Sequence, residues 1–128
     1  MYYVKCLATS IIGVLLSFNV FSAERDALSA GWNGEKRCEN LHEDDYIRVL
    51  RCTFPPTIGH ERHAHPASFL YVLNGGNGQV TDANGTRNFE VTTDQYRLNK
   101  PVEWHEAVNT GDTTMRYLII EQKYPAQQ

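Results

Sequence analysis

The stretch of residues 59–76, GHERHAHPASFLYVLNGG, decides how this chain folds and where a functional site is expected. It carries a pair of histidines, His63 and His65, and continues into the apolar run 68–73 and a glycine-rich turn. On a β-strand, residues two apart point to the same face, about 6.6–7 Å apart along the strand. Two imidazoles placed in this way can converge on one metal ion, and the apolar strand and turn that follow them favour a buried position.

A third ligand has to come from another strand. His105 is the candidate, because it lies in a separate segment with strand character. Three neutral imidazoles suit a divalent transition metal (iron, zinc, nickel or copper) and suit calcium or magnesium poorly. The alternative interpretation of His63 and His65 is a pair of solvated surface histidines.

The rest of the chain also has strand character. Segments rich in β-branched and aromatic residues recur about every ten residues with turn residues between them, which is typical of a β-sandwich or small barrel. Asn84-Gly85 favours a type I′ hairpin turn, and residues 25–30 favour one short helical turn ended by Gly31. The expected strands are 46–54, 68–73, 79–82, 86–91, 95–98, 104–109 and 115–122.

The N-terminus has the pattern of an export signal. Lys5 precedes the apolar run 6–21, and the small residues Ser22 and Ala23 follow it. A membrane-spanning helix would need about 20 apolar residues. We therefore expect a signal peptide over 1–23 and a periplasmic or secreted protein that is free of the membrane after cleavage; an uncleaved anchor is the alternative. The mature chain then divides into an N-terminal arm and first hairpin strand (24–45), a β-barrel (46–123) and a loose tail (124–128).

The net charge and the cysteines give two further indications about the kind of protein. The formal net charge of −3, without a basic cluster, argues against nucleic-acid binding. Cys38 and Cys52 lie on either side of the polar stretch 43–45, so a turn there would place them directly opposite each other across a hairpin. Opposed residues have Cα atoms about 4.5–5.5 Å apart, which a disulfide can span, and export permits oxidation. Two buried thiols are the alternative.

These residues resemble the motifs of small single-domain cupins of type 2. His63-Ala64-His65 matches the paired histidines of the first cupin motif, with Gly75 as its closing glycine, and the segment from His105 to Asn109 matches the H-x3-N of the second. The resemblance covers residues 46–121. It implies an all-β, cupin-type jelly-roll barrel whose histidines hold a divalent metal, and it also implies a homodimer.

The chain departs from the cupin pattern at the glutamate. Ser68 stands in its place, Gly59 lies closer to the paired histidines than the motif asks, and the second motif lacks its glycine. The candidates for a fourth ligand or a pocket position are therefore Ser68, Glu61 and Glu103. His60 should point away from His63 on a regular strand. Phe69, Tyr71, Tyr96 and Trp104 are candidates for lining the pocket, with ordinary core packing as the alternative.

Three functions remain open at this point. The first is a binding module that holds a small molecule beside the metal. The second is a metal-dependent enzyme, either a dioxygenase or a lyase or isomerase, in which the metal activates a small substrate. The third is a structural barrel with a degenerate site. The sequence contains no nucleophile elbow, phosphate-binding loop or Cys-x-x-Cys motif that would point to another chemistry.

Overall fold

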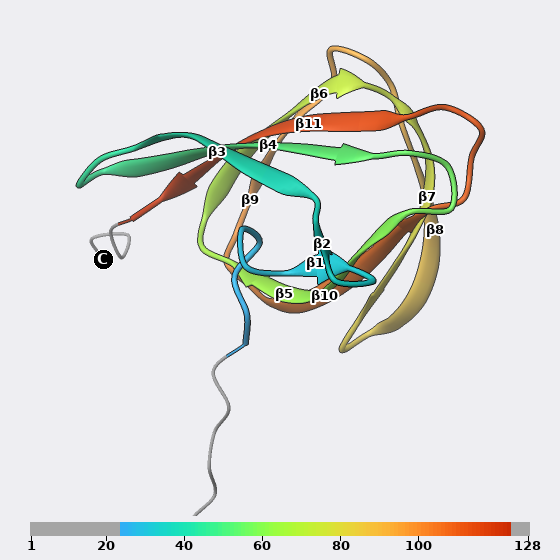
Figure 1. The fold of residues 1–128 in the computed structure, drawn as a ribbon, viewed down its shortest axis with the longest axis horizontal. Helices are drawn as coiled ribbons and strands as arrows, with labels where there is room; N and C mark the ends of the chain where they lie inside the picture. The colour runs from blue at the N-terminus through green and yellow to red at the C-terminus, as the bar shows by residue number, and fades with distance from the viewer. Residues whose placement is uncertain (1–23, 124–128) are drawn as a thin grey trace, which may run out of the picture.

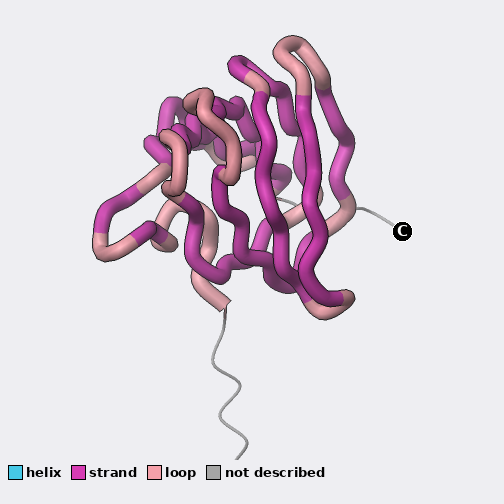
Figure 2. The backbone as a smooth tube through the Cα atoms, turned by 90° about the vertical axis from the view of Figure 1, so that its right-hand side faces the viewer, coloured by secondary structure: helices cyan, strands magenta, loops and turns pink. Residues whose placement is uncertain are grey.

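The computed structural model describes residues 24–123, and the expected signal peptide and C-terminal tail lie outside this range. The described chain is entirely β-structure, turns and loops, as Figure 2 shows. Within it no helix is long and apolar enough to cross a membrane. The strands are β1 (Gly31–Trp32), β2 (Glu35–Lys36), β3 (Cys38–Glu43), β4 (Ile47–Phe54), β5 (Gly59–His65), β6 (Ser68–Asn74), β7 (Gly76–Asp82), β8 (Gly85–Val91), β9 (Tyr96–Asn99), β10 (Val102–Asn109) and β11 (Met115–Gln122).

Two antiparallel sheets face each other and form a sandwich (Figure 1). One sheet has the strand order β3-β4-β11-β6-β9 and the other has the order β5-β10-β7-β8, while β1 and β2 form a separate small hairpin. Side chains alternate across each sheet because successive residues of a strand point to opposite faces. In β11 the inward residues Met115, Tyr117, Ile119 and Glu121 are all buried. The all-β sandwich predicted from the sequence is confirmed.

The hydrophobic core lies between the sheets and is built mainly from the inward faces of β4, β6 and β11. Leu50 and Cys52 are fully buried, and Val72 is 1% exposed. Burying a side chain such as that of Leu50 contributes about 1.5–3 kcal/mol to folding. This packing holds the two sheets against each other.

The β3–β4 hairpin carries a disulfide between Cys38 and Cys52. The two residues are direct partners in the register of the hairpin, at the position expected from the sequence. Asp44 closes the turn by accepting hydrogen bonds from the backbone N–H groups of Tyr46 and Ile47. In the chain-entropy model, a bridge that closes a loop of about 15 residues contributes about 3 kcal/mol.

The β7–β8 hairpin forms where Asn84-Gly85 predicts it, but the predicted type I′ turn is wrong. Asp82 pairs with Gly85, so the turn itself is made by Ala83 and Asn84. Gly85 has a φ of 103°, whereas Asn84 does not have the positive φ that a type I′ turn requires. The side chain of Asp82 accepts a hydrogen bond from the N–H of Asn84, and this local bond favours the observed turn over a type I′ turn.

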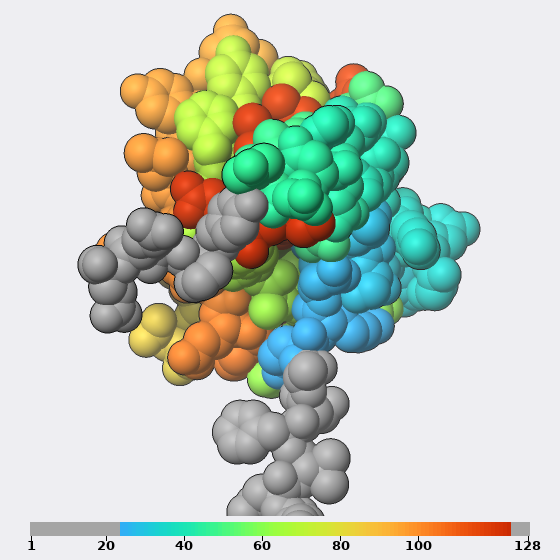
Figure 3. Space-filling model, turned by 90° about the vertical axis from the view of Figure 1, so that its left-hand side faces the viewer, coloured from blue at the N-terminus to red at the C-terminus, as the bar shows by residue number. Residues whose placement is uncertain are grey.

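The N-terminal arm, residues 24–30, lies against the sandwich rather than extending from it (Figure 3, blue beside the β3–β4 hairpin). The expected helical turn is a single turn, closed by the N–H of Ala30 donating to the carbonyl of Asp26. Ala64 donates its N–H to the carbonyl of Arg25, which attaches the arm to β5. The arm therefore reaches the strand that carries the paired histidines.

Candidate metal centre

Three histidines converge between the sheets. His63 and His65 come from β5, and His105 lies on β10 directly across from His63. The Nε2 atom of His63 lies 3.0 Å from the Nε2 of His65 and 3.0 Å from the Nε2 of His105. One nitrogen of each residue lies within 4.8 Å of the others. The sequence-predicted triad is thus brought together in one place.

This arrangement fits a bound transition-metal ion. Ligand nitrogens at about 2.0–2.1 Å from an ion lie about 3 Å from one another, as the Nε2 atoms do here. Ligation also requires neutral imidazoles. Burial, together with the neighbouring histidines, lowers the pKa of His63 to about 2 and that of His105 to about 4, so both rings are uncharged at neutral pH. These three residues could therefore hold iron, zinc, nickel or copper.

Hydrogen bonds donated by the Nδ1 atoms orient two of the rings. His63 donates from Nδ1 to the carbonyl of Glu61 over 2.6 Å, and His65 donates from Nδ1 to Oε1 of Glu121 over 2.7 Å. A ring whose Nδ1 carries the hydrogen presents an unprotonated Nε2. Both rings therefore present a lone pair toward the common point.

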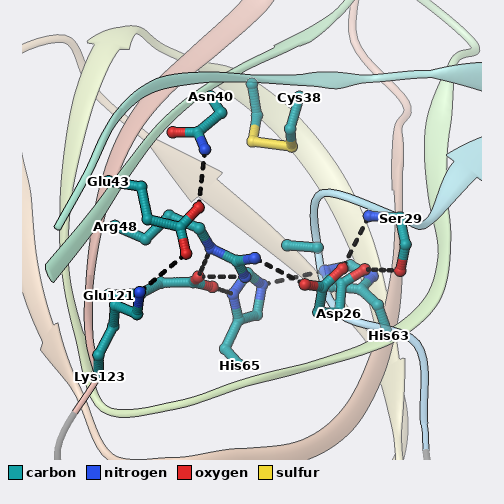
Figure 4. Close-up of polar contacts among 12 residues, drawn as sticks. Asp26, Ser29, Cys38, Asn40, Glu43, Arg48, His63, His65, Glu121 and Lys123 are labelled. Carbon is teal, nitrogen blue, oxygen red and sulfur yellow. Dashed lines mark hydrogen bonds and ion pairs between the residues drawn. A yellow bond between two sulfur atoms is a disulfide. The ribbon is translucent and has the colours of Figure 1, made fainter. Parts of the chain in front are cut away.

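The carboxylate of Glu121 is the functional group that the sequence reasoning missed. Its side chain is 1% exposed and lies on β11, directly across from Ser68. Its Oε2 accepts hydrogen bonds from Nε and Nη2 of Arg48, and Nη1 of Arg48 donates to Asp26 of the N-terminal arm (Figure 4). Burial alone would raise the pKa of Glu121, but the hydrogen bonds from His65 and Arg48 hold that pKa below its usual value.

The site therefore contains a carboxylate, although not in the expected position. Ser68 occupies the place of the motif's glutamate, and Glu121 supplies a buried carboxylate from the neighbouring strand. Glu121 touches the far nitrogen of His65, so it supports a ligand rather than joining the three Nε2 atoms. A signal for it was present in the sequence: Glu121 is the only charged residue at the inward positions of 115–122.

Two β-bulges explain which residues face the site. His105 pairs with His63 and Ala107 with His60, so β5 has one extra residue between His60 and His63. The extra residue reverses the parity, and His60 faces the same side as His63. The expectation that His60 points away is therefore wrong. His60 is 3% exposed, and its ring lies against that of His63 at a tilt of 35°, with centroids 3.8 Å apart. Its Nε2 donates to the carbonyl of Ala27 over 2.9 Å.

The second bulge removes Glu103 and Trp104 from the site. Val102 pairs with His65 and His105 with His63, so β10 carries one extra residue between Val102 and His105. Glu103 is exposed, which makes it a poor candidate for the fourth ligand. Trp104 instead packs under the guanidinium of Arg62, 4.0 Å from the ring centroid.

Of the other two candidates for a fourth ligand or pocket position, Ser68 lies at the site and Glu61 does not. Ser68 is 6% exposed and lines the same cavity as the three histidines. Glu61 is directed elsewhere: it forms an ion pair with Arg25 over 3.1 Å and accepts a hydrogen bond from the N–H of Asn33. It therefore does not replace the missing ligand.

The cavity above the histidines has a volume of about 310 Å³. None of the four predicted aromatic residues lines it, because Phe69, Tyr71 and Tyr96 lie on the outer face of their sheet and Trp104 follows the bulge. Phe69 and Tyr96 stack on each other there, with centroids 5.8 Å apart. The aromatic lining comes instead from Phe54, Phe89 and Tyr117.

The structure is similar to several solved structures. A cupin domain from Bordetella pertussis Tohama I gives a TM-score of 0.63, with 18% identity over 68% of this chain and 92% of that chain. A conserved protein with a double-stranded β-helix domain from Klebsiella pneumoniae gives 0.59, with 21% identity over 74% and 83%. The polyketide cyclase RemF from Streptomyces resistomycificus gives 0.55, with 19% identity over 70% and 66%. No protein-family sequence model matches the chain, and no curated protein sequence does.

Proposed function

We propose that this protein, which has the cupin fold, binds one divalent transition-metal ion through His63, His65 and His105 and holds a small molecule beside it. The observation that carries the proposal is the convergence of the three Nε2 atoms beside a cavity of about 310 Å³. A three-histidine site leaves coordination positions for water or a ligand. The bound ion would act as a Lewis acid toward an oxygen donor in the cavity.

The chain's own residues prepare this site in three ways. The carbonyl of Glu61 and the carboxylate of Glu121 hold the rings of His63 and His65 in one tautomer. His60 packs against His63 and connects it to the N-terminal arm. Apolar side chains, including Leu70 and Phe89, line the cavity and reduce its water content.

The deciding experiment is elemental analysis of the mature, untagged protein, made by export and purified without chelator. We expect about one equivalent of iron, nickel, copper or zinc, and none in the double variant H63A/H65A. The control is H42A, because His42 is exposed on β3 and bonds to Asp44 rather than to the site. Equal metal content in the double variant and in the wild type would overturn the proposal.

A metal-dependent enzyme is the second candidate. It is favoured by the open side of the triad, because a metal held by three protein ligands can take both substrate and water. If the purified protein contains iron, oxygen consumption that depends on an added substrate would support a dioxygenase. Bound metal without turnover of any tested substrate would favour the binding module.

We also propose that the protein is exported and that its signal peptide is cleaved. The signal pattern of residues 1–23 supports it, and so does the disulfide between Cys38 and Cys52, because such bonds persist in oxidising compartments. Mass spectrometry of the protein recovered from the periplasm or medium should find a chain that begins at residue 23 or 24. Recovery of the full-length chain in the membrane fraction would favour an uncleaved anchor.

A further inference from the structure

One wall of the cavity carries polar side chains that the metal centre does not use. Ser68 of β6 and Arg97 and Asn99 of β9 line the same cavity as the three histidines. Tyr96 and Leu98, which alternate with them along β9, are strongly exposed and point to the other face. Arg97 is also exposed, so it lies at the open edge of the cavity, whereas Asn99 is half-buried. The inward placement of Arg97 and Asn99 therefore follows from the register of β9 against β6.

That register also gives the positions of these residues along the sheet relative to the metal centre. Asn99 pairs with Ser68, and Ser68 pairs with Glu121, the residue that holds His65. Arg97 pairs with Leu70, one inward position further along the sheet. Inward positions of a strand are spaced about 6.6–7 Å apart. Arg97 thus lies on the same wall of the cavity as Glu121, one inward position further along the sheet.

The charge of Arg97 is not compensated within residues 24–123. The other arginine of the cavity, Arg87, forms an ion pair with Asp82 over 2.8 Å. Asp82 is the only acidic residue that lines the cavity, and no ion pair of Arg97 is found in the described chain. The side chains of Ser68 and Asn99 likewise make no hydrogen bond to another described residue, so their donors are available to a ligand.

The remaining wall is apolar. Phe54, Leu70, Phe89, Val91 and Tyr117 contribute most of it. A cavity of about 310 Å³ is at the small end of the range for small-molecule sites. It combines a positive group at its edge, neutral donors and an apolar surface in a small volume.

We propose that the ligand is a small organic acid with an apolar body, whose carboxylate is bound by Arg97 and Asn99. An arginine fork matches a carboxylate in geometry and charge. The apolar body packs against Leu70 and Phe89, and a second donor atom of the ligand faces the histidines. The proposal rests on the proposed function only for this last contact, because the carboxylate subsite does not include a metal ligand.

The test is a set of matched binding titrations by calorimetry at pH 7. The probes are benzoate and hexanoate, each compared with its neutral amide, benzamide or hexanamide. We expect both acids to bind at least about tenfold more tightly than their amides, since a charged hydrogen bond adds about 1.5–3 kcal/mol. R97Q should reduce this preference to about onefold, mainly by weakening the binding of the acids. The control R116Q removes the same charge from an exposed position of β11 outside the cavity and should keep the preference.

Each titration is repeated on metal-free and zinc-loaded protein, with the zinc content of every sample measured. A preference for acids that survives in metal-free protein and disappears in R97Q supports the carboxylate subsite, even if no metal binds and the proposed function fails. Acids that bind only to zinc-loaded protein, or that keep their preference in R97Q, would overturn the inference while leaving the metal site intact. Absence of binding by both acids would overturn it as well.

Discussion

His65 and Glu121 are 56 positions apart in the chain, and Nδ1 of His65 donates to the buried carboxylate of Glu121 over 2.7 Å. This contact joins β5, which carries the histidine pair, to β11 in the opposite sheet. It sets which nitrogen of His65 is available to an ion, and Arg48 holds the carboxylate from its other side.

Replacing Glu121 should weaken metal binding without abolishing it. E121Q keeps the shape of the side chain but removes its charge, and loss of such support for a ligand typically costs about 10–100-fold in metal affinity. Competition with a chromophoric chelator measures this change. E103Q is the control, because Glu103 is close to His105 in sequence but is exposed. Equal affinities for E121Q and the wild type would mean that His65 does not need its partner.

Arg48 should matter for stability far more than Arg51 of the same strand. R48M leaves Glu121 with a buried charge that has lost one partner, which typically costs about 3–5 kcal/mol. R51M breaks the ion pair with Glu39, whose side chain is 55% exposed, and should cost less than about 1 kcal/mol. Urea unfolding of both variants measures the difference. Similar losses in the two variants would contradict the assignment of Arg48 as the support of a buried carboxylate.

His60 and His105 should separate into a structural residue and a ligand. H60Q retains a donor for the carbonyl of Ala27, so it should bind about one metal equivalent. H105Q removes one of the three converging Nε2 atoms and should lose most of the ion. Elemental analysis of the two variants under the same purification distinguishes the roles. Loss of metal in H60Q with retention in H105Q would reverse the assignment.

Removing the disulfide should lower stability but leave the metal site in place. The double variant C38A/C52A removes the covalent link across the β3–β4 hairpin and should cost about 2–4 kcal/mol in urea unfolding. Its metal content should equal that of the wild type, because neither cysteine lines the cavity. Reduction of the wild-type protein with dithiothreitol is the parallel measurement and should give a loss of similar size.

The arm should confer sensitivity to acid through Asp26. Partial burial alone would raise the pKa of Asp26, but hydrogen bonds from Ser29 and Arg48 lower it from 3.8 to about 2. Because the folded-state pKa lies below the unfolded one, the stabilisation is present above 3.8 and is lost as the pH falls toward about 2. The free energy of unfolding of D26N should therefore depend less on pH across this window. D112N, at an exposed position, should follow the wild type.

Local sequence patterns were sufficient to predict the all-β architecture. Runs of β-branched and aromatic residues between turn signals marked most of the strands, and the polar stretch between Cys38 and Cys52 indicated their hairpin. Gly75 stands where the motif predicts a glycine for a clear reason: a Cβ at this position would lie 2.3 Å from the carbonyl oxygen of Val91. The strand runs and turn residues depend on near neighbours, so one sequence can reveal them.

The details of the site depended on features with no local signal. A β-bulge adds one residue without changing composition, so simple alternation placed His60 outside the site and Glu103 within reach of it. The apolar run 68–73 suggested that Phe69 and Tyr71 line a cavity, whereas Ser68 and Leu70 do so. Strand parity within that run follows from the pairing of Ser68 with Glu121, a long-range contact that periodicity cannot supply.

The bridge that Arg48 makes between Asp26 and Glu121 joins residues that are synthesised at very different times. A ribosome makes Asp26 first and Glu121 last, so the histidines leave it before the carboxylate that holds His65 exists. If the chain is exported in extended form, it crosses the membrane without an ion, because His105 is brought to His63 and His65 only when β10 pairs with β5. The metal inventory of the destination compartment, rather than that of the cytosol, would then decide which ion the finished protein contains.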